Sequence, residues 1–302
     1  MSPVPDEPTA PIPPSDPREG WSLPGFGEMP ITSVLDARVA RVLAPNASPM
    51  TLDGTNTYVL GEPGSGAVIV LDPGPDDPGH RERVEQVVAE RDAEVAGIVV
   101  THHHVDHAEA AVAWAARYGC RVVASTEQIA GRDGRVVADA DAVDAGGLRL
   151  QVVATPGHTR DHIAVRMDDG TLLTGDHVLG RGTSVVAYPD GDLTAYLESL
   201  RRVLDLGPAR LLPGHGPELT EDPQAVLRFY RDHRRFREQQ ILAILAVGPA
   251  TPAQLVARIY AEVDRRVWPA AEASTRAALA SLADRDRVWL RDDGYAELPR
   301  GD

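Results

Sequence analysis

A run of four histidines and one aspartate within six residues constrains this 302-residue chain more than any other feature. The run, THHHVDH at positions 101–107, directly follows the apolar stretch Ala96–Val100 and precedes an amphipathic stretch, His107–Tyr118. This order predicts a buried strand, a short loop and a helix, with the polar side chains in the loop. Because functional sites are commonly built in such loops, we expect a sheet-and-helix layer protein with its site at one edge.

The spacing inside the run divides its side chains into two sets. In an extended segment His102 and His104 point to the same side, while His103 points to the other. Asp106 and His107 turn with the start of the helix and can face a second point nearby. The run therefore predicts two adjacent groups of ligands, with His103 on the surface.

Three more candidate ligands follow short apolar stretches further along the chain. His158 lies in TPGHT, Asp176 in LTGD and His215 in LPGHG, each in a turn that contains glycine. Scattered surface histidines would not recur in this order at the ends of strands. The pattern predicts one site that is assembled from several strand ends.

Seven such side chains exceed what one tetrahedral ion can use, so the sequence predicts two metal ions. A first metal would take His102, His104 and His158, and a second would take Asp106, His107 and His215, with Asp176 bridging. Imidazole and carboxylate ligands suit zinc, although iron or manganese would also accept this set. The single cysteine, Cys120, excludes both an intramolecular disulfide and a cysteine-rich zinc site.

The pattern of the whole chain predicts three regions: a disordered proline-rich tail at 1–30, a catalytic domain at 31–225 and a small C-terminal domain at 226–302. In the last region, three helical stretches precede two short strands with an Asp-Gly turn, which is typical of a winged-helix-like domain. The expected strands of the catalytic domain are Val39–Leu43, Asn56–Leu60, Val68–Leu71, Ala96–Val100, Arg121–Ala124, Leu148–Ala154, Ile163–Met167, Thr171–Thr174 and Arg210–Leu212. The expected helices of the whole chain are Gly79–Arg91, His107–Tyr118, Leu193–Asp205, Pro223–Ala246, Pro252–Ala261 and Ala271–Asp284.

Charge and composition exclude several classes of binding partner and catalytic mechanism. The formal net charge is −15, and all 30 basic residues are arginines, so lysine-based mechanisms are excluded. The acidity argues against an anionic membrane and against double-stranded DNA. We find no apolar run that could span a bilayer and no secretory signal, and expect a cytoplasmic protein. The sequence does not indicate an oligomeric state.

With these motifs the chain resembles the metallo-β-lactamase fold superfamily over residues 30–225, where all five family motifs occur in family order. Asp72, in VLDPG, matches the first motif, whose aspartate supports the metal ligands instead of binding metal. The resemblance implies a four-layer αββα sandwich with the metals at one edge. It also implies hydrolysis by a hydroxide that bridges two zinc ions, with Asp106 and Asp176 as catalytic residues.

Several branches of the superfamily fit poorly. True metallo-β-lactamases often have cysteine, or no bridging ligand, where this chain has Asp176. The segment from Asp176 to His215 is too short for the inserted domain of the mRNA-cleavage nucleases. Hydroxyacylglutathione hydrolases share the histidine run but typically bind glutathione through lysines, which this chain lacks.

The branch that matches best is that of the lactamase-β-like endoribonucleases. The resemblance depends on TPGHTRDH at 155–162, GDHVLGRGTSV at 175–185, LESL at 197–200, LPGHGP at 212–217 and HRRFREQQIL at 233–242. It implies a phosphodiesterase acting on single-stranded RNA. The net charge instead favours a small substrate, so a thioester, ester or lactone hydrolase remains the alternative. A nucleic-acid-binding regulator is disfavoured by the intact ligand set.

Three further residues are candidates for substrate contact. Arg181 and Thr183 follow the predicted bridging aspartate in a loop bracketed by glycines, where they would hold an anionic substrate. An exposed loop arginine without such a role is the commoner case. His162 would touch substrate or support a ligand, and a structurally bonded imidazole is an equal alternative.

Overall fold

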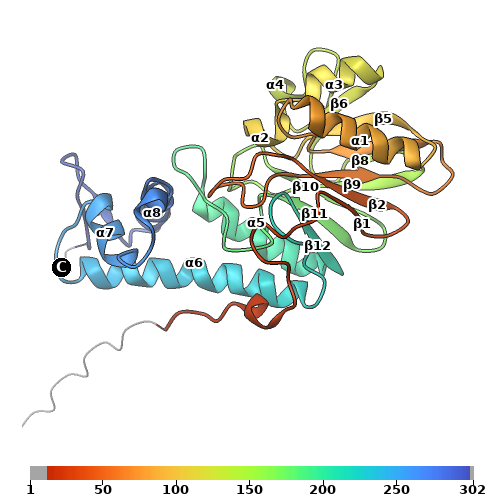
Figure 1. The fold of residues 1–302 in the computed structure, drawn as a ribbon. Coiled ribbons are helices and arrows are strands. Elements are labelled where there is room, and N and C mark those ends of the chain that lie inside the picture. The colour runs from red at the N-terminus through yellow and green to blue at the C-terminus, as the bar shows by residue number, and fades with distance from the viewer. Residues whose placement is uncertain (1–11, 300–302) are drawn as a thin grey trace, which may run out of the picture.

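Two mixed β-sheets pack face to face in this computed structural model, which describes residues 12–299 (Figure 1). Helices cover the outer face of each sheet, which gives the four-layer αββα sandwich that the sequence predicted. A long helix then leads to a small helical region beside the sandwich.

The first sheet has seven strands in sequence order. Its first four strands are antiparallel, and the last four, β4 to β7, run parallel. The parallel strands are connected through helices on one face, and β4 is buried at four of its five positions, as expected for strands covered on both faces. The strands are β1 Thr32–Val34, β2 Val39–Leu43, β3 Asn56–Leu60, β4 Ala67–Leu71, β5 Glu94–Val99, β6 Arg121–Ala124 and β7 Arg135–Val136.

The second sheet has five strands in the order β12-β11-β10-β9-β8. Four of them pair antiparallel, and β11 pairs with β12 in parallel after the chain crosses over through helix α5, Leu193–Leu206. The strands are β8 Ala142–Ala145, β9 Leu148–Ala154, β10 Ile163–Arg166, β11 Thr171–Gly175 and β12 Arg210–Pro213. Strands β11 and β12 therefore end at the same edge, each just before a predicted ligand.

Three apolar clusters hold the layers together. Tyr58 and Leu71 of the first sheet meet Leu150 and Ile163 of the second, all nearly without exposed surface. The outer face of the first sheet packs against α1 (Pro78–Glu90) and α3 (Ala111–Tyr118), and that of the second against α5 and α6 (Pro223–Leu245). Burial of these side chains fixes where the strand ends lie.

The C-terminal region contains α7 (Pro252–Ile259), the 3-10 turn η2 (Arg265–Val267), α8 (Trp268–Ala283) and the hairpin of β13 (Trp289–Leu290) and β14 (Ala296–Glu297). Together with α6, the helices α7 and α8 and the hairpin form the winged-helix-like arrangement that the sequence predicted. Its buried side chains belong to the same apolar cluster as α5 and α6. The region is thus packed onto the sandwich.

The helix predicted at His107–Tyr118 is divided into α2 (Val105–Ala108) and α3. The break occurs because Gly74 takes part in the backbone hydrogen bonds there: its N–H donates to the His107 carbonyl, and its carbonyl accepts from Ala110. This contact, together with the turn Glu127–Ala130 (α4) and the strands β1, β7 and β8, was not predicted from the sequence.

The N-terminal tail differs from the expectation of disorder. Residues 1–11 lie outside the described part of the chain, but the segment that follows forms the 3-10 turn η1 (Pro17–Gly20) and packs against α6. The buried Arg18 donates hydrogen bonds to the carbonyls of Leu179 and Gly182, at 2.9 and 2.7 Å. One buried arginine therefore anchors a segment that composition alone assigns to disorder.

The domain boundaries at 30 and 225 remain predictions. Within residues 12–299, no helix combines the length and the apolar character needed to cross a membrane.

Candidate metal centre

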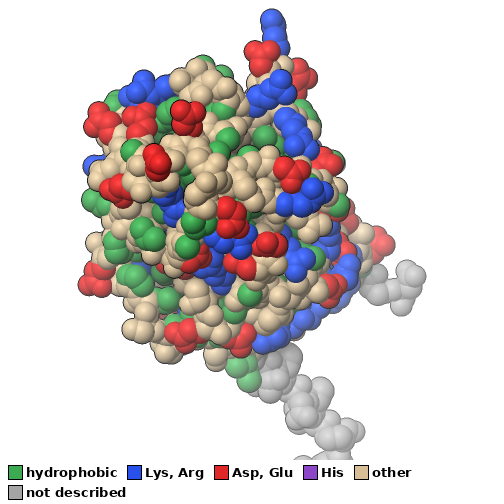
Figure 2. Space-filling model, turned by 90° about the vertical axis from the view of Figure 1, so that its right-hand side faces the viewer, with side chains coloured by type: hydrophobic (Ala, Val, Ile, Leu, Met, Phe, Trp, Pro, Cys, Tyr) green, Lys and Arg blue, Asp and Glu red, His purple; other side chains and the backbone are tan. Residues whose placement is uncertain are grey.

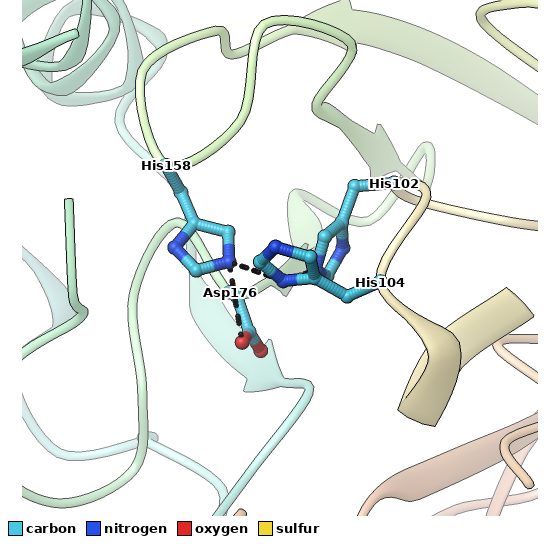
Figure 3. Close-up of side chains that lie close together, drawn as sticks. All are labelled: His102, His104, His158 and Asp176. Carbon is cyan, nitrogen blue, oxygen red and sulfur yellow. Dashed lines mark hydrogen bonds and ion pairs between the residues drawn. The ribbon is translucent and has the colours of Figure 1, made fainter. Parts of the chain in front are cut away.

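Three histidines and one aspartate converge at the edge where the strands end (Figure 3). His102 and His104 come from the loop after β5, His158 from the loop after β9, and Asp176 from the end of β11. The His104 Nδ1 atom lies 3.0 Å from His102 Nε2 and 3.1 Å from His158 Nε2. We call the three imidazoles the three-histidine group, and Asp176 lies beside them.

Asp106, His107 and His215 form a second group beside the first. The Nε2 atoms of His107 and His215 are 3.2 Å apart, and Asp106 Oδ2 lies 3.2 Å from His215 Nε2. Asp176 contacts both groups: its Oδ2 lies 3.6 Å from His158 Nε2, and its Oδ1 lies 3.4 Å from each Nε2 of the second group. We call the three residues the Asp106 group, and Asp176 lies between this group and the three-histidine group.

The donor atoms fit metal ions. Ligand atoms of a tetrahedral site, each about 2.1 Å from the ion, lie about 3.4 Å from one another. Six contacts between donor atoms of the site are between 3.0 and 3.6 Å, and all donor atoms of each cluster lie within 4.8 Å of one another. In addition, Asp176 Oδ1 is buried and has no hydrogen-bond partner within the described residues. A bound cation would satisfy that oxygen.

Each of four imidazoles is oriented by a contact of its other nitrogen, the arrangement found around metal-ligating histidines. These contacts are His102 Nδ1 with Thr101 Oγ1 at 3.0 Å, His158 Nδ1 with the Val185 carbonyl at 2.6 Å, His107 Nδ1 with Asp72 Oδ2 at 2.8 Å, and His215 Nδ1 with the Gly54 carbonyl at 3.1 Å.

Asp72 lies behind the ligands, without exposed surface. Its carboxylate accepts hydrogen bonds from the backbone N–H and the hydroxyl of Thr101, both at 2.8 Å, in addition to its contact with His107. Thr101 in turn contacts His102, so Asp72 touches one group directly and the other through a hydroxyl. This is the supporting position that the first motif implied.

Comparison with known proteins identifies the family. Residues 50–215 match the metallo-beta-lactamase superfamily. The chain belongs to this superfamily. Residues 251–294 match the beta-lactamase associated winged helix domain.

Relatives with names of several kinds are similar over most of the chain. A beta-lactamase-like protein 2 homolog of Drosophila melanogaster is 34% identical over 297 residues, which covers 89% of this chain and 96% of the relative. An atrochrysone carboxyl ACP thioesterase of Aspergillus chevalieri is 33% identical over 228 residues, 75% of this chain and 71% of the relative. A protein of the same name from Aspergillus fumigatus is 30% identical over 77% of this chain and 76% of its own length.

A metallo-beta-lactamase family protein from Thermus thermophilus has a similar solved structure. The TM-score is 0.75 at 24% identity, and the match covers 88% of this chain and all of the other. The two proteins therefore share their fold over most of this chain.

Electrostatics differ between the two groups of this superfamily site. Burial, together with the neighbouring His107 and His158, lowers the pKa of His102 well below its ordinary value. Burial and His158 lower the pKa of His104 to about 4, and burial also lowers the pKa of His158. These imidazoles are therefore neutral at pH 7, with lone pairs free for a cation.

In the Asp106 group, burial opposes protonation, but neighbouring carboxylates outweigh it. Asp176 and Asp72 raise the pKa of His107 well above its ordinary value, and Asp176 and Asp106 raise the pKa of His215 to about 9. The same pairs stabilise the carboxylates against burial: His215 and His107 lower the pKa of Asp106 to about 2 and hold that of Asp176 well below its usual range.

The three predicted substrate residues lie in different surroundings. His162 is buried, with Nδ1 2.8 Å from Thr155 Oγ1, and its Nε2 accepts a hydrogen bond from the backbone N–H of Asp176 at 3.1 Å. The His162 ring thus contacts the backbone of Asp176, and the choice among the roles that the sequence left open stays a prediction. Thr183 is half-buried in the loop after β11.

Arg181 faces the N-terminal segment. Its guanidinium donates to the carbonyls of Pro24 and Gly25 and lies 3.8 Å from Asp53 Oδ2. These contacts tie the arginine to the N-terminal segment, and its contact with an anionic substrate stays a prediction.

Sequence reasoning missed several residues that shape the site. A Cβ atom at Gly214 would lie 2.7 Å from both Asp176 Oδ1 and a His107 ring carbon, so only glycine fits beside the ligands. The PGH pattern signals this close approach. Thr101 was visible as the first residue of the histidine run, but the carbonyls of Gly54 and Val185 carry no sequence signal.

Proposed function

We propose that this protein is a metal-dependent hydrolase of small acyl substrates, with thioesters as the first class to test. The observation that carries the proposal is the convergence of seven imidazole and carboxylate side chains at one edge, in two groups joined by Asp176. Ions held there would supply a water that attacks near neutral pH and a positive charge beside the developing oxyanion.

The side chains divide the remaining work. Asp176 reaches both groups with its two oxygens and so fixes the spacing between them, while the His162 ring holds its backbone. Asp106 is the more open carboxylate, with 24% of its side chain exposed against 11% for Asp176. Because its pKa is lowered to about 2, Asp106 is ionised at neutral pH and would accept a hydrogen bond from a water at the site.

Surface charge supports a small substrate over a nucleic acid. The exposed arginines of α6 would have to form the basic stripe that RNA needs, yet Arg228, Arg231 and Arg235 each lie within 4.0 Å of an aspartate. On the face drawn in Figure 2, acidic side chains also lie among the basic ones. With a net charge of −15, the protein offers little salt-dependent attraction for a phosphate backbone.

The relatives support the acyl alternative over the endoribonuclease expectation. Two of them are named as ACP thioesterases and are similar over about three quarters of this chain. A thioester carbonyl presents the electrophilic centre that a metal-activated water attacks, and its thiolate leaves readily. We therefore place thioesters before esters, lactones and RNA.

The test is a panel of substrates with metal-loaded protein. Acyl thioesters of N-acetylcysteamine and coenzyme A, an aryl ester, a lactone, a phosphodiester chromogen and labelled single-stranded RNA are compared at equal enzyme concentration. We expect the largest kcat/KM for a thioester and the loss of that activity in Asp176→Asn. Cleavage of RNA with little or no turnover of any acyl substrate would refute the proposal in favour of the endoribonuclease.

A further inference from the structure

Helix α6 carries a buried arginine, Arg234, that contacts the loop after β11. Arg234 is 7% exposed, and none of the ion pairs among residues 12–299 includes it. A buried guanidinium without a carboxylate is costly unless other groups stabilise it. The groups that stabilise Arg234 belong to segments that also contact a candidate metal ligand.

Two contacts stabilise this charge. The guanidinium carbon lies 5.1 Å from the centre of the Tyr196 ring, in cation–π geometry, and Nη2 donates a hydrogen bond to the Ser184 carbonyl. Tyr196 belongs to α5, and its hydroxyl donates to the His177 carbonyl at 2.5 Å. Arg234 thus joins α6 to the β11–α5 loop, residues 176–192, which begins with Asp176.

The loop transmits this contact to the ligands. Ser184 is buried, and its hydroxyl donates to the carbonyls of Asp176 at 2.6 Å and His177 at 3.1 Å. The next carbonyl, that of Val185, accepts the hydrogen bond of His158 Nδ1 at 2.6 Å. With Nδ1 held in this way, His158 directs Nε2 toward His104 and Asp176 (Figure 3).

We propose that Arg234 is a positioning residue of the metal centre, which fixes the Ser184–Val185 peptide and through it the orientation of the His158 imidazole. The inference rests on the metal centre proposed above. It assigns to α6, which packs against the outer face of the second sheet, an indirect part in the geometry of the three-histidine group. Partners that orient metal-ligating histidines typically change metal affinity 10–100-fold when they are removed.

The first experiment compares Arg234→Met with the matched variant Arg235→Gln. Arg235 is the next residue on α6, and 62% of its side chain is exposed. Zn²⁺ affinity is measured by competition with a chelator, and the visible spectrum of the Co²⁺-loaded protein reports ligand geometry. For Arg234→Met we expect a 10–100-fold loss of affinity at one site, an altered spectrum and a lower kcat with little change in KM. Arg235→Gln should match the wild type.

A double-mutant cycle tests the route. If Arg234 acts through His158, the double variant Arg234→Met/His158→Ala should bind metal no more weakly than His158→Ala alone. An equal further loss in that background would overturn the proposed route. Wild-type affinity and spectrum in Arg234→Met would overturn the role altogether.

A third variant keeps the proposal testable if Arg234→Met does not fold. Arg234→Lys retains the charge but has no planar fork with which to stack on Tyr196 and reach Ser184 together. We expect an affinity between those of the wild type and the methionine variant, and an affinity equal to the wild type would overturn the proposal. If the wild-type protein itself binds no metal, the proposed metal centre is wrong, and the role of Arg234 falls with it. If only the Arg234 variants behave like the wild type, the role of Arg234 alone is wrong.

Discussion

The two ligand groups lie side by side but are held by different parts of the molecule. In the Asp106 group, His107 is held by Asp72 and His215 by the Gly54 carbonyl, which belong to the first sheet and the segment leading into it. In the three-histidine group, His158 is held by Val185, in a loop fixed by α6.

This difference teaches that one site can depend on two structural supports. The backbone around His215 is bonded to the first sheet through Asn56, whose N–H donates to the Gly214 carbonyl at 2.8 Å and whose side chain donates to Pro213 and Gly216. The support of His158 lies outside the strands. Substitutions in one support should therefore weaken the two groups unequally, whereas a substitution of Asp176, which touches both, should weaken both.

Asp176→Ala gives the largest expected effect, because it removes the one side chain common to both groups. Loss of partners that only orient ligands costs 10–100-fold, so loss of a shared ligand should reduce turnover by more than about 100-fold. Metal content by elemental analysis should also fall below the wild-type value. Near-normal turnover in Asp176→Ala would remove the basis for treating the two groups as one centre.

Asp72→Asn should separate the groups. Asp72 contacts His107 directly but His102 only through Thr101, so metal affinity should fall about 10–100-fold in the Asp106 group and less in the other. Chelator competition resolves the two affinities, and the exposed Asp76→Asn is the control. Equal losses at both sites would contradict the separate supports.

His80 lies outside both groups, so its protonation should change the free energy of unfolding with pH without changing metal affinity. His80 lies buried against Thr57, and burial lowers its pKa from 6.5 to about 4. The unfolded chain therefore binds this proton more readily, so its contribution to stability is present above pH 6.5 and is lost as pH falls toward 4, at up to about 1.4 kcal/mol per pH unit.

Urea unfolding of metal-free protein between pH 4.5 and 7.5 measures this slope. In His80→Gln the free energy of unfolding should depend less steeply on pH, by the slope that corresponds to at most one bound proton. Metal affinity at pH 7 should stay that of the wild type. An unchanged slope would show that His80 is not held neutral.

Arg18→Met should have the smallest effect on the centre. Arg18 fixes the same loop as Arg234, but at Leu179 and Gly182, neither of which hydrogen-bonds to a ligand side chain within residues 12–299. Loss of its buried hydrogen bonds should lower the free energy of unfolding by about 1–3 kcal/mol, with metal affinity nearly unchanged. Chemical denaturation checks the first value, with the exposed Arg201→Met as the control. A loss of metal affinity as large as that of Arg234→Met would erase the distinction between the two arginines.

Most of the sandwich and the ligand set could be predicted because the apolar stretches that form the strands end just before the candidate ligands. Strands β2, β3, β6 and β9 have the predicted bounds, and His158, Asp176 and His215 each follow a strand by a few residues. Hydrophobic periodicity locates buried strands well. The positions of the ligands at successive strand ends then predict that they meet in one site.

The rest depends on contacts that leave no pattern in the sequence. Strand β7 has only two residues, both exposed, which is too short to form an alternating apolar pattern. Arg18 and Arg234 look like other arginines in the sequence, and only the fold shows that they are buried against carbonyls far along the chain. The partners of Arg181 could not be predicted for the same reason, since they lie in the N-terminal segment.

One titration tests the central claim most directly: thioester turnover followed while Zn²⁺ is added to metal-free protein, with bound metal measured in the same samples. The account predicts that activity rises with bound metal to a plateau near two ions per chain, and that Asp176→Asn has no such rise. Full thioester turnover without metal, or a plateau at one ion with no further binding, would contradict the two-group centre.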